Sequence, residues 1–125
     1  MLRTALIFSV LFVAYDALAA ALARWIVISY DSFVVPPVIA AFFMGVYAGR
    51  KKRSWGGLAP VALAAVVEVT VGWYVAALIG PGYVPGWTLR ELIVLATESA
   101  ALIIAVGAAG VWVGLGVSGV RRGFL

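Results

Sequence analysis

Four long apolar segments dominate this chain of 125 residues and limit what it can fold into. They cover about residues 4–29, 33–49, 58–79 and 88–118, and charged residues make up only 11% of the sequence. A soluble domain carries about 25% charged residues, and one of this length still exposes roughly a third of its surface. So much apolar surface therefore predicts an all-α protein that folds within a lipid bilayer.

The lengths of the segments predict how many of them cross the bilayer. A spanning helix needs about 20 apolar residues, and the first, third and fourth segments reach that length. The second is shorter and begins near Pro36-Pro37, and the residue before a proline avoids helical geometry. We expect its helix to begin at or just after the prolines and to reach the interface through long basic side chains. The sequence thus predicts a single domain, residues 1–125, that is a bundle of four transmembrane helices at about 4–29, 36–51, 58–79 and 88–118.

Positive charge gathers in the connections that a four-helix topology places on one side. These residues are Arg3, Arg50, Lys51, Lys52, Arg53, Arg121 and Arg122, whereas the other side carries only Asp31, Arg90 and Glu91. The positive-inside rule then predicts cytoplasmic N- and C-termini for a multi-pass protein of the cell (plasma or inner) membrane.

The basic cluster Arg50–Arg53 has two interpretations. It could bind anionic lipid headgroups, and it is also explained as a topology signal alone. The net charge of +4 does not indicate nucleic acid, because the charge is confined to short connections and does not follow one face. We therefore expect the lipid bilayer as a partner and no nucleic acid.

Three acids, Asp16, Glu68 and Glu98, lie inside the apolar segments. A carboxylate at bilayer depth costs a few kcal/mol, so it indicates function. The helical rise places Asp16 and Glu68 near the midplane, with Glu98 about 9 Å and Arg24 about 10 Å toward the outer face. We expect Arg24 and Glu98 to form an ion pair, and Asp16 and Glu68 to have no basic partner within the chain.

Two carboxylates for which the sequence offers no obvious basic partner must be protonated, share a proton, bind a cation or meet a basic group from another molecule. The leading hypothesis is a protein that binds or translocates protons or small cations through Asp16, Glu68 and Glu98. We expect a homo-oligomer, because four helices alone enclose little room for a path. The alternative is a non-catalytic accessory or assembly subunit of a larger membrane complex, whose basic residues pair with these acids. A third possibility is a lipid-binding or purely structural module.

Nearby polar side chains offer a structural interpretation of the same acids. A protonated carboxyl can hydrogen-bond to a hydroxyl across helices, at roughly 0.6 to 2 kcal/mol. The available side chains are Tyr15, Thr70, Thr97 and Ser99, and Arg24 can also extend to the interface.

Small residues predict which faces pack closely. Gly45 and Gly49 form one GxxxG motif and Gly110 and Gly114 another, which we interpret as tight packing within the chain in preference to a dimer face. Two faces combine an acid with small residues and are expected to point inward. They are Ala64, Ala65, Glu68, Gly72 and Ala76 in the third segment, and Glu98, Ala101, Ala105 and Ala108 in the fourth.

Enzymatic chemistry has little support in the sequence. The chain contains no His and no Cys, which removes the commonest general base, the thiol nucleophile and most metal ligands. No hydroxyl has an adjacent base. We therefore expect no enzyme, no catalytic residues, no cofactor and no metal.

Overall fold

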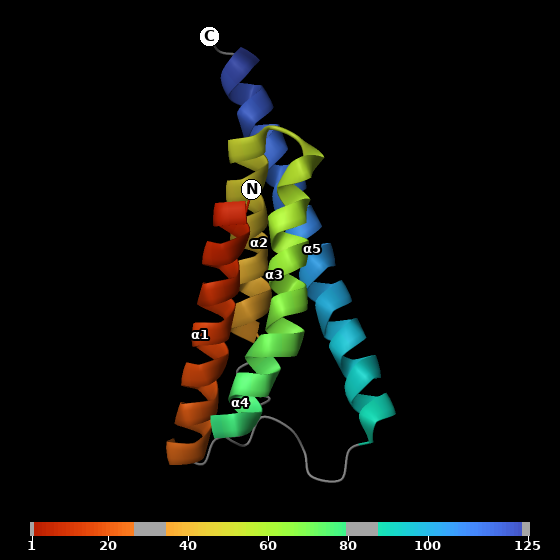
Figure 1. Ribbon diagram of the computed structural model, residues 1–125. Coiled ribbons are helices and arrows are strands. Elements are labelled where there is room, and N and C mark those ends of the chain that lie inside the picture. Colours follow the sequence, from red (N-terminus) through yellow and green to blue (C-terminus); the bar gives the residue numbers. More distant parts are fainter. Residues whose placement is uncertain (1, 27–34, 80–87, 124–125) are drawn as a thin grey trace.

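The computed structural model describes residues 2–26, 35–79 and 88–123, and within these ranges it is helical without strands (Figure 1). The prediction of an all-α chain with four helices is confirmed. The first helix is α1 (Leu2–Ile26) and the second is α2 (Val35–Lys52). The third is built from η2 (Trp55–Gly57), α3 (Leu58–Val67), the π-helical turn η3 (Glu68–Gly72) and α4 (Trp73–Ile79), and the fourth is α5 (Leu89–Gly123).

Local chemistry explains where the helices begin. α2 starts at Val35, one residue before Pro36-Pro37 and so slightly earlier than expected. The first four N–H groups of a helix have no helical acceptor, so prolines there remove no hydrogen bond. α5 starts with a capping box, in which Glu91 N–H donates to Thr88 Oγ1 (3.2 Å) and Thr88 N–H donates to Glu91 Oε2 (2.8 Å).

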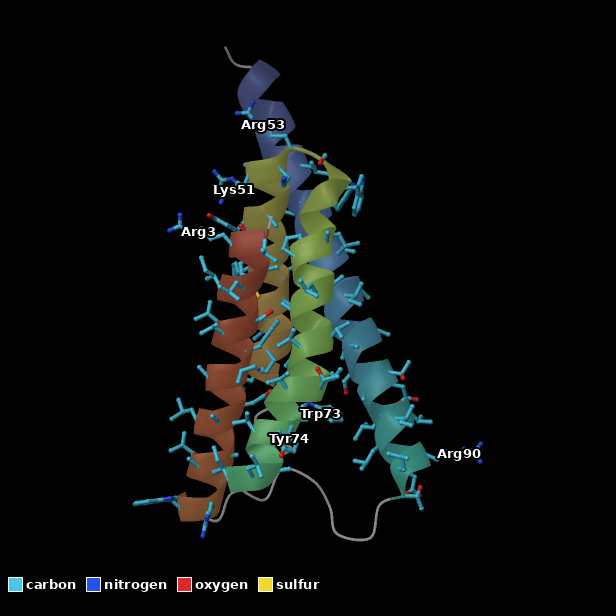
Figure 2. All side chains as sticks on the ribbon, in the orientation of Figure 1. Arg3, Lys51, Arg53, Trp73, Tyr74 and Arg90 are labelled. Carbon is cyan, nitrogen blue, oxygen red and sulfur yellow. The ribbon has the colours of Figure 1, made fainter. Side chains whose placement is uncertain are left out.

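Three stretches are long and apolar enough to cross a membrane: Leu2–Trp25, Trp55–Ile79 and Leu89–Val117. The second helix, α2, has 18 residues and ends in Arg50, Lys51 and Lys52. α1 begins and both α2 and α5 end at the same end of the bundle, where Figure 2 shows Arg3, Lys51 and Arg53. We call this the basic end, and the end where α1 and α4 stop and α5 starts the opposite end.

The third helix is the centre of the packing. α3 contacts α1, α2 and α5, while α1 lies along α3, η3 and α4. Within the described ranges, the backbones of α1 and α5 do not come within 8 Å of each other between Cα atoms, and neither do those of α4 and α5. The core lies where α1, α2, α3 and α5 converge. It consists of these buried apolar residues: Phe8, Phe12, Ala41, Met44, Ala48, Val61, Ala64, Ala65 and Ile103.

α2 and α5 run parallel and meet backbone to backbone, in the most extensive helix pair of the bundle. A Cβ on Gly45 would collide with the carbonyl oxygen of Gly107, and a Cβ on Gly110 would collide with that of Phe42. A Cβ on Gly49 would come within 2.6 Å of the Val111 carbonyl oxygen. Only glycine permits this approach, so both GxxxG motifs are used within the chain, as interpreted from the sequence.

α2 does not extend as far as its neighbours toward the opposite end (Figure 1). The glycine contacts fix its register on α5 and place Val35 at about the level of Ala100. Along α5, no residue from Leu89 to Leu102 is buried, and the first buried one is Ile103. The first part of α5 is therefore only partly covered, because α2, its main partner, starts only where that part ends.

Candidate functional site

Asp16 and Glu68 come together between α1 and the third helix. Asp16 is 3% exposed and Glu68 is 6% exposed, and they are the only buried acids among the described residues. Their carboxylates are close enough to repel each other when both are ionised. Asp16 Oδ2 also lies directly against Gly72, where a Cβ would collide with it. The site is thus two carboxylates buried at the same helix junction, with a glycine making room for one of them.

Spacing in the sequence places both acids on packed faces. The buried residues of α1 around Asp16 are Phe8, Phe12, Ala19, Ala20 and Ala23, which recur at intervals of three and four. In the third helix the face predicted from small residues is buried throughout: Ala64, Ala65, Glu68, Gly72 and Ala76. The inward orientation predicted for that face is therefore confirmed.

Glu68 opens the π-helical turn η3, which the sequence analysis did not foresee. The Trp73 N–H donates to the Glu68 carbonyl five residues back, so the helix is locally widened at the acid. Figure 2 shows Trp73 and Tyr74 directly after this turn. π-helical turns occur mostly as single turns and frequently at functional sites. A signal was present in the sequence, because Val69, Thr70 and Val71 are three β-branched residues in a row and such residues fit an α-helix less well.

Glu68 Oε2 is fully buried and has no hydrogen-bond partner among the described residues. A buried polar atom without a partner costs about 1–3 kcal/mol, and more if it is charged. The group therefore does not stabilise the fold in its ionised form. It is a position where a proton or a cation would remove an energetic penalty.

Thr70 does not support the carboxylates. Its side chain is exposed, and its hydroxyl donates to the carbonyl oxygens of Val66 (2.6 Å) and Val67 (3.3 Å) in its own helix. Thr97 behaves in the same way, with its hydroxyl 2.8 Å from the Ile93 carbonyl oxygen. Both hydroxyls thus bind backbone within the helix, which is common for Thr, and the expected hydrogen bonds to the acids are not formed.

Tyr15 on α1 and Ser99 on α5 are both half-buried. Tyr15 precedes Asp16 on α1 and its phenol interacts electrostatically with that carboxylate. Ser99 follows Glu98 on α5, a helix that also contacts η3, and no hydrogen bond from its hydroxyl to either of the described buried acids is formed. Tyr15 is therefore the only one of the four predicted supporting hydroxyls that the described contacts bring to the buried acids.

Glu98 does not join the other two acids. It is exposed on α5, and so are Ala101 and Ala105, which were expected to face inward with it. The reason is that α5 buries the opposite face, through Gly107 and Gly110, against α2. The inward orientation predicted for the Glu98 face is therefore wrong.

The ion pair expected between Arg24 and Glu98 is not formed either. The backbones of α1 and α5 stay more than 8 Å apart between Cα atoms within the described ranges, and Arg24 is exposed at the end of α1. Its guanidinium donates to the carbonyl oxygen of Ile79 (3.1 Å), the last residue of α4. A cation at a helix C-terminus is stabilised by the unpaired carbonyls there. Arg24 therefore stabilises the C-terminus of α4 and does not pair with an acid.

The basic cluster Arg50–Arg53 is exposed at the basic end. Lys51 Nζ lies 5.6 Å from the centroid of the Tyr47 ring, which in turn contacts Phe8 edge to face. Arg53 closes α2 in the left-handed conformation (φ 55°), and its N–H donates to the Gly49 carbonyl oxygen (2.8 Å). The cluster is thus partly built into the turn, and its charged groups remain available to an anionic surface.

Comparison with known proteins gives no relative from which a role could be transferred. No family model matches the chain, and neither a curated protein nor a solved structure was found to match it.

Proposed function

We propose that this chain is a multi-pass protein of the cell membrane that binds a proton or small cation at the Asp16–Glu68 pair and passes it across the bilayer. The observation that carries the proposal is the burial of both carboxylates where α1 packs on the π-helical turn, with Asp16 Oδ2 against Gly72, one turn beyond Glu68. Glu68 lies about 20 Å from Trp55 and about 17 Å from Ile79 along its helix, so the pair is near the middle of a candidate span. Ionisable groups at that depth are characteristic of proton and ion pathways.

Charge arithmetic favours one positive charge at the pair. Two ionised carboxylates in a medium of low dielectric constant repel strongly, and a single bound proton or monovalent cation relieves most of that repulsion. The close fit of Asp16 against Gly72 leaves little room around the carboxylates, which favours a proton over a hydrated cation. The homo-oligomer expected from the sequence belongs to this proposal, since the four helices pack through small residues and leave little space for a water-filled path.

The membrane frame is part of the proposal. α2 lies parallel to α5 in backbone contact, so a bilayer that contains α5 also contains the greater part of α2. Exposed tryptophans at both ends, Trp25 and Trp55, suit the two interfaces. With the basic end in the cytoplasm, both termini are cytoplasmic, and Arg50–Arg53 faces anionic headgroups.

The accessory-subunit alternative, in which another protein neutralises Asp16 and Glu68, has weaker support at this site. Both side chains are almost completely covered within the chain. A basic group from a partner would reach them only after α1 separated from the third helix.

The experiment is an ion-flux assay on the purified chain in liposomes. We expect the chain to dissipate an imposed pH gradient, read with an enclosed pH-sensitive dye, and expect Asp16→Asn and Glu68→Gln each to reduce the rate toward that of protein-free liposomes. Parallel gradients of Na⁺ and K⁺ distinguish a proton from a metal cation. The matched control is Glu91→Gln, which also removes one acid but keeps the capping box, because Gln serves at that position.

Two results would contradict the proposal. One is a wild-type chain that moves none of these ions faster than empty liposomes do. The other is an ion flux that the Asp16→Asn and Glu68→Gln substitutions leave unchanged while Glu91→Gln behaves identically.

A further inference from the structure

Glu98 is an exposed acid far from either end of its helix. Gly107 of α5 rests on the Val61 side chain of α3, which fixes the relative level of the two helices. From that contact toward the opposite end, Glu68 is seven residues along and Glu98 nine. At 1.5 Å per residue, Glu98 lies only about 3 Å beyond the level of Glu68. It is thus deeper than the sequence predicted and faces outward from the chain.

The face around Glu98 has the pattern of a helix-packing surface. Val94, Glu98, Ala101 and Ala105 follow one another at intervals of three and four, with Leu102 beside them, and all are exposed. Alanines at such spacing allow the backbone of another helix to approach closely. This face is opposite to the glycines that bind α2, so α5 has one face packed within the chain and one that no described helix covers.

The chain has no described base that could neutralise Glu98. Arg90, on the same helix, is eight residues nearer the opposite end, or about 12 Å. Arg24 is held at Ile79, eleven residues beyond Glu68 and so about 13 Å past the level of Glu98. A second copy in the same orientation has its bases at these same depths, so it offers Glu98 no counter-charge either.

We infer that the exposed face of α5 from Val94 to Ala105 is a docking surface for a transmembrane helix of a different protein, one that carries a lysine or arginine at the depth of Glu98. Charge complementarity selects this occupant over lipid and over another copy of the chain, because each of those leaves a carboxylate in contact with hydrocarbon. The inference concerns a different face and a different acid from the Asp16–Glu68 site, so it stands or falls independently of the proposed ion movement.

The test uses synthetic transmembrane helices as the probe, reconstituted with the full chain in lipid bilayers. One peptide is a Leu/Ala helix with a single central Lys, and its matched control has Leu at that position. Because the chain has no cysteine, Lys52→Cys at the exposed end of α2 gives one fluorophore site, and association is read by energy transfer. We expect the Lys peptide to associate about tenfold more tightly than the Leu peptide.

Substitutions locate the preference on this face. Glu98→Gln should abolish the preference for the Lys peptide, whereas Glu91→Gln should retain it. Cysteine crosslinking gives the position: Ala101→Cys should crosslink to a cysteine in the Lys peptide, and Leu63→Cys, exposed on α3, should not. Circular dichroism of each variant verifies that the helices are intact.

Several outcomes would overturn the inference. The first is an equal affinity for the Lys and Leu peptides, and the second is a Lys preference that survives Glu98→Gln. Efficient crosslinking between two copies through Ala101→Cys would show that another copy covers the face. A crosslink within one chain from Ala101→Cys to Ser32→Cys would show that the chain covers its own surface.

Discussion

At the scale of single residues, the closest fit in the candidate site is between an acid and a glycine. Asp16 Oδ2 occupies the space that a side chain at position 72 would need. Gly72 therefore acts as a positioning residue, since it lets the Asp16 carboxylate approach the backbone of the π-helical turn. Its role is spatial, because glycine here supplies room and no chemical group.

Gly72→Ala is expected to lower the free energy of unfolding by about 1–3 kcal/mol, as an added methyl group does in a packed interior. It should also slow ion flux, because Asp16 must move. The measurement is unfolding in mixed micelles by titration with a denaturing detergent. Gly116→Ala is the control, since a Cβ there meets nothing within 4 Å.

A double variant tests whether the loss of stability in Gly72→Ala arises from a collision with the Asp16 carboxylate. If the methyl group acts on the Asp16 carboxylate, then Gly72→Ala should cost clearly less in a chain that already carries Asp16→Ala. Equal costs in the two backgrounds would show that Gly72 is needed for another reason, and would remove its positioning role.

At the scale of helices, the α2–α5 pair joins glycines to backbone carbonyls. A backbone carbonyl cannot rotate away as a side chain can, so a methyl group added to one of these glycines forces the two helices apart. We expect Gly45→Ala and Gly110→Ala each to lower the free energy of unfolding by at least about 3 kcal/mol, the upper end of the cost of overpacking. Gly119→Ala should not lower it and should raise it slightly, since a Cβ there meets nothing within 4 Å and Ala favours the helix over Gly.

Dependence on concentration shows whether this helix pair acts within one chain. The loss of stability in Gly45→Ala should not change with the protein-to-detergent ratio. A loss that disappears on dilution would assign the glycines to contacts between copies, contrary to the structure.

Helix positions were readable from the sequence because apolar runs and breakers mark them directly. The inward face of the third helix was also readable, since Glu68, Gly72 and the alanines share one spacing. The same reasoning failed on α5 because that helix offers two small-residue faces. One carries Ala101 and Ala105 and the other Gly107 and Gly110, and glycine allows the closer approach.

Two further features depend on contacts that spacing does not reveal. Arg24 binds the backbone carbonyl of Ile79, and a carbonyl is present at every position of a sequence, so its choice of partner has no signature. The depth of Glu98 depends on which residue of α3 meets Gly107, and that register comes only from packing.

At the scale of the whole molecule, the distribution of charge predicts its orientation in the membrane. Arg3, Lys51 and Arg53 lie at one end and Arg90 at the other (Figure 2). With single cysteines at Lys52 and Arg90, a membrane-impermeant maleimide should label only Arg90→Cys in intact cells, and both after permeabilisation. Labelling of both positions in intact cells would contradict cytoplasmic termini and the four-span arrangement.

The pairing of α2 with α5 also has a consequence for biosynthesis. α2 is the helix least suited to hydrocarbon by itself, because it is short and ends in three bases, and its main partner, α5, leaves the ribosome only after the third helix. We expect the nascent chain to hold α2 loosely until residues 107–114 have been translated. A chain truncated before residue 107 would lack the glycine contacts of α5. We expect its α2 to lack its main packing partner and the truncated chain to be degraded by the cell's quality-control proteases.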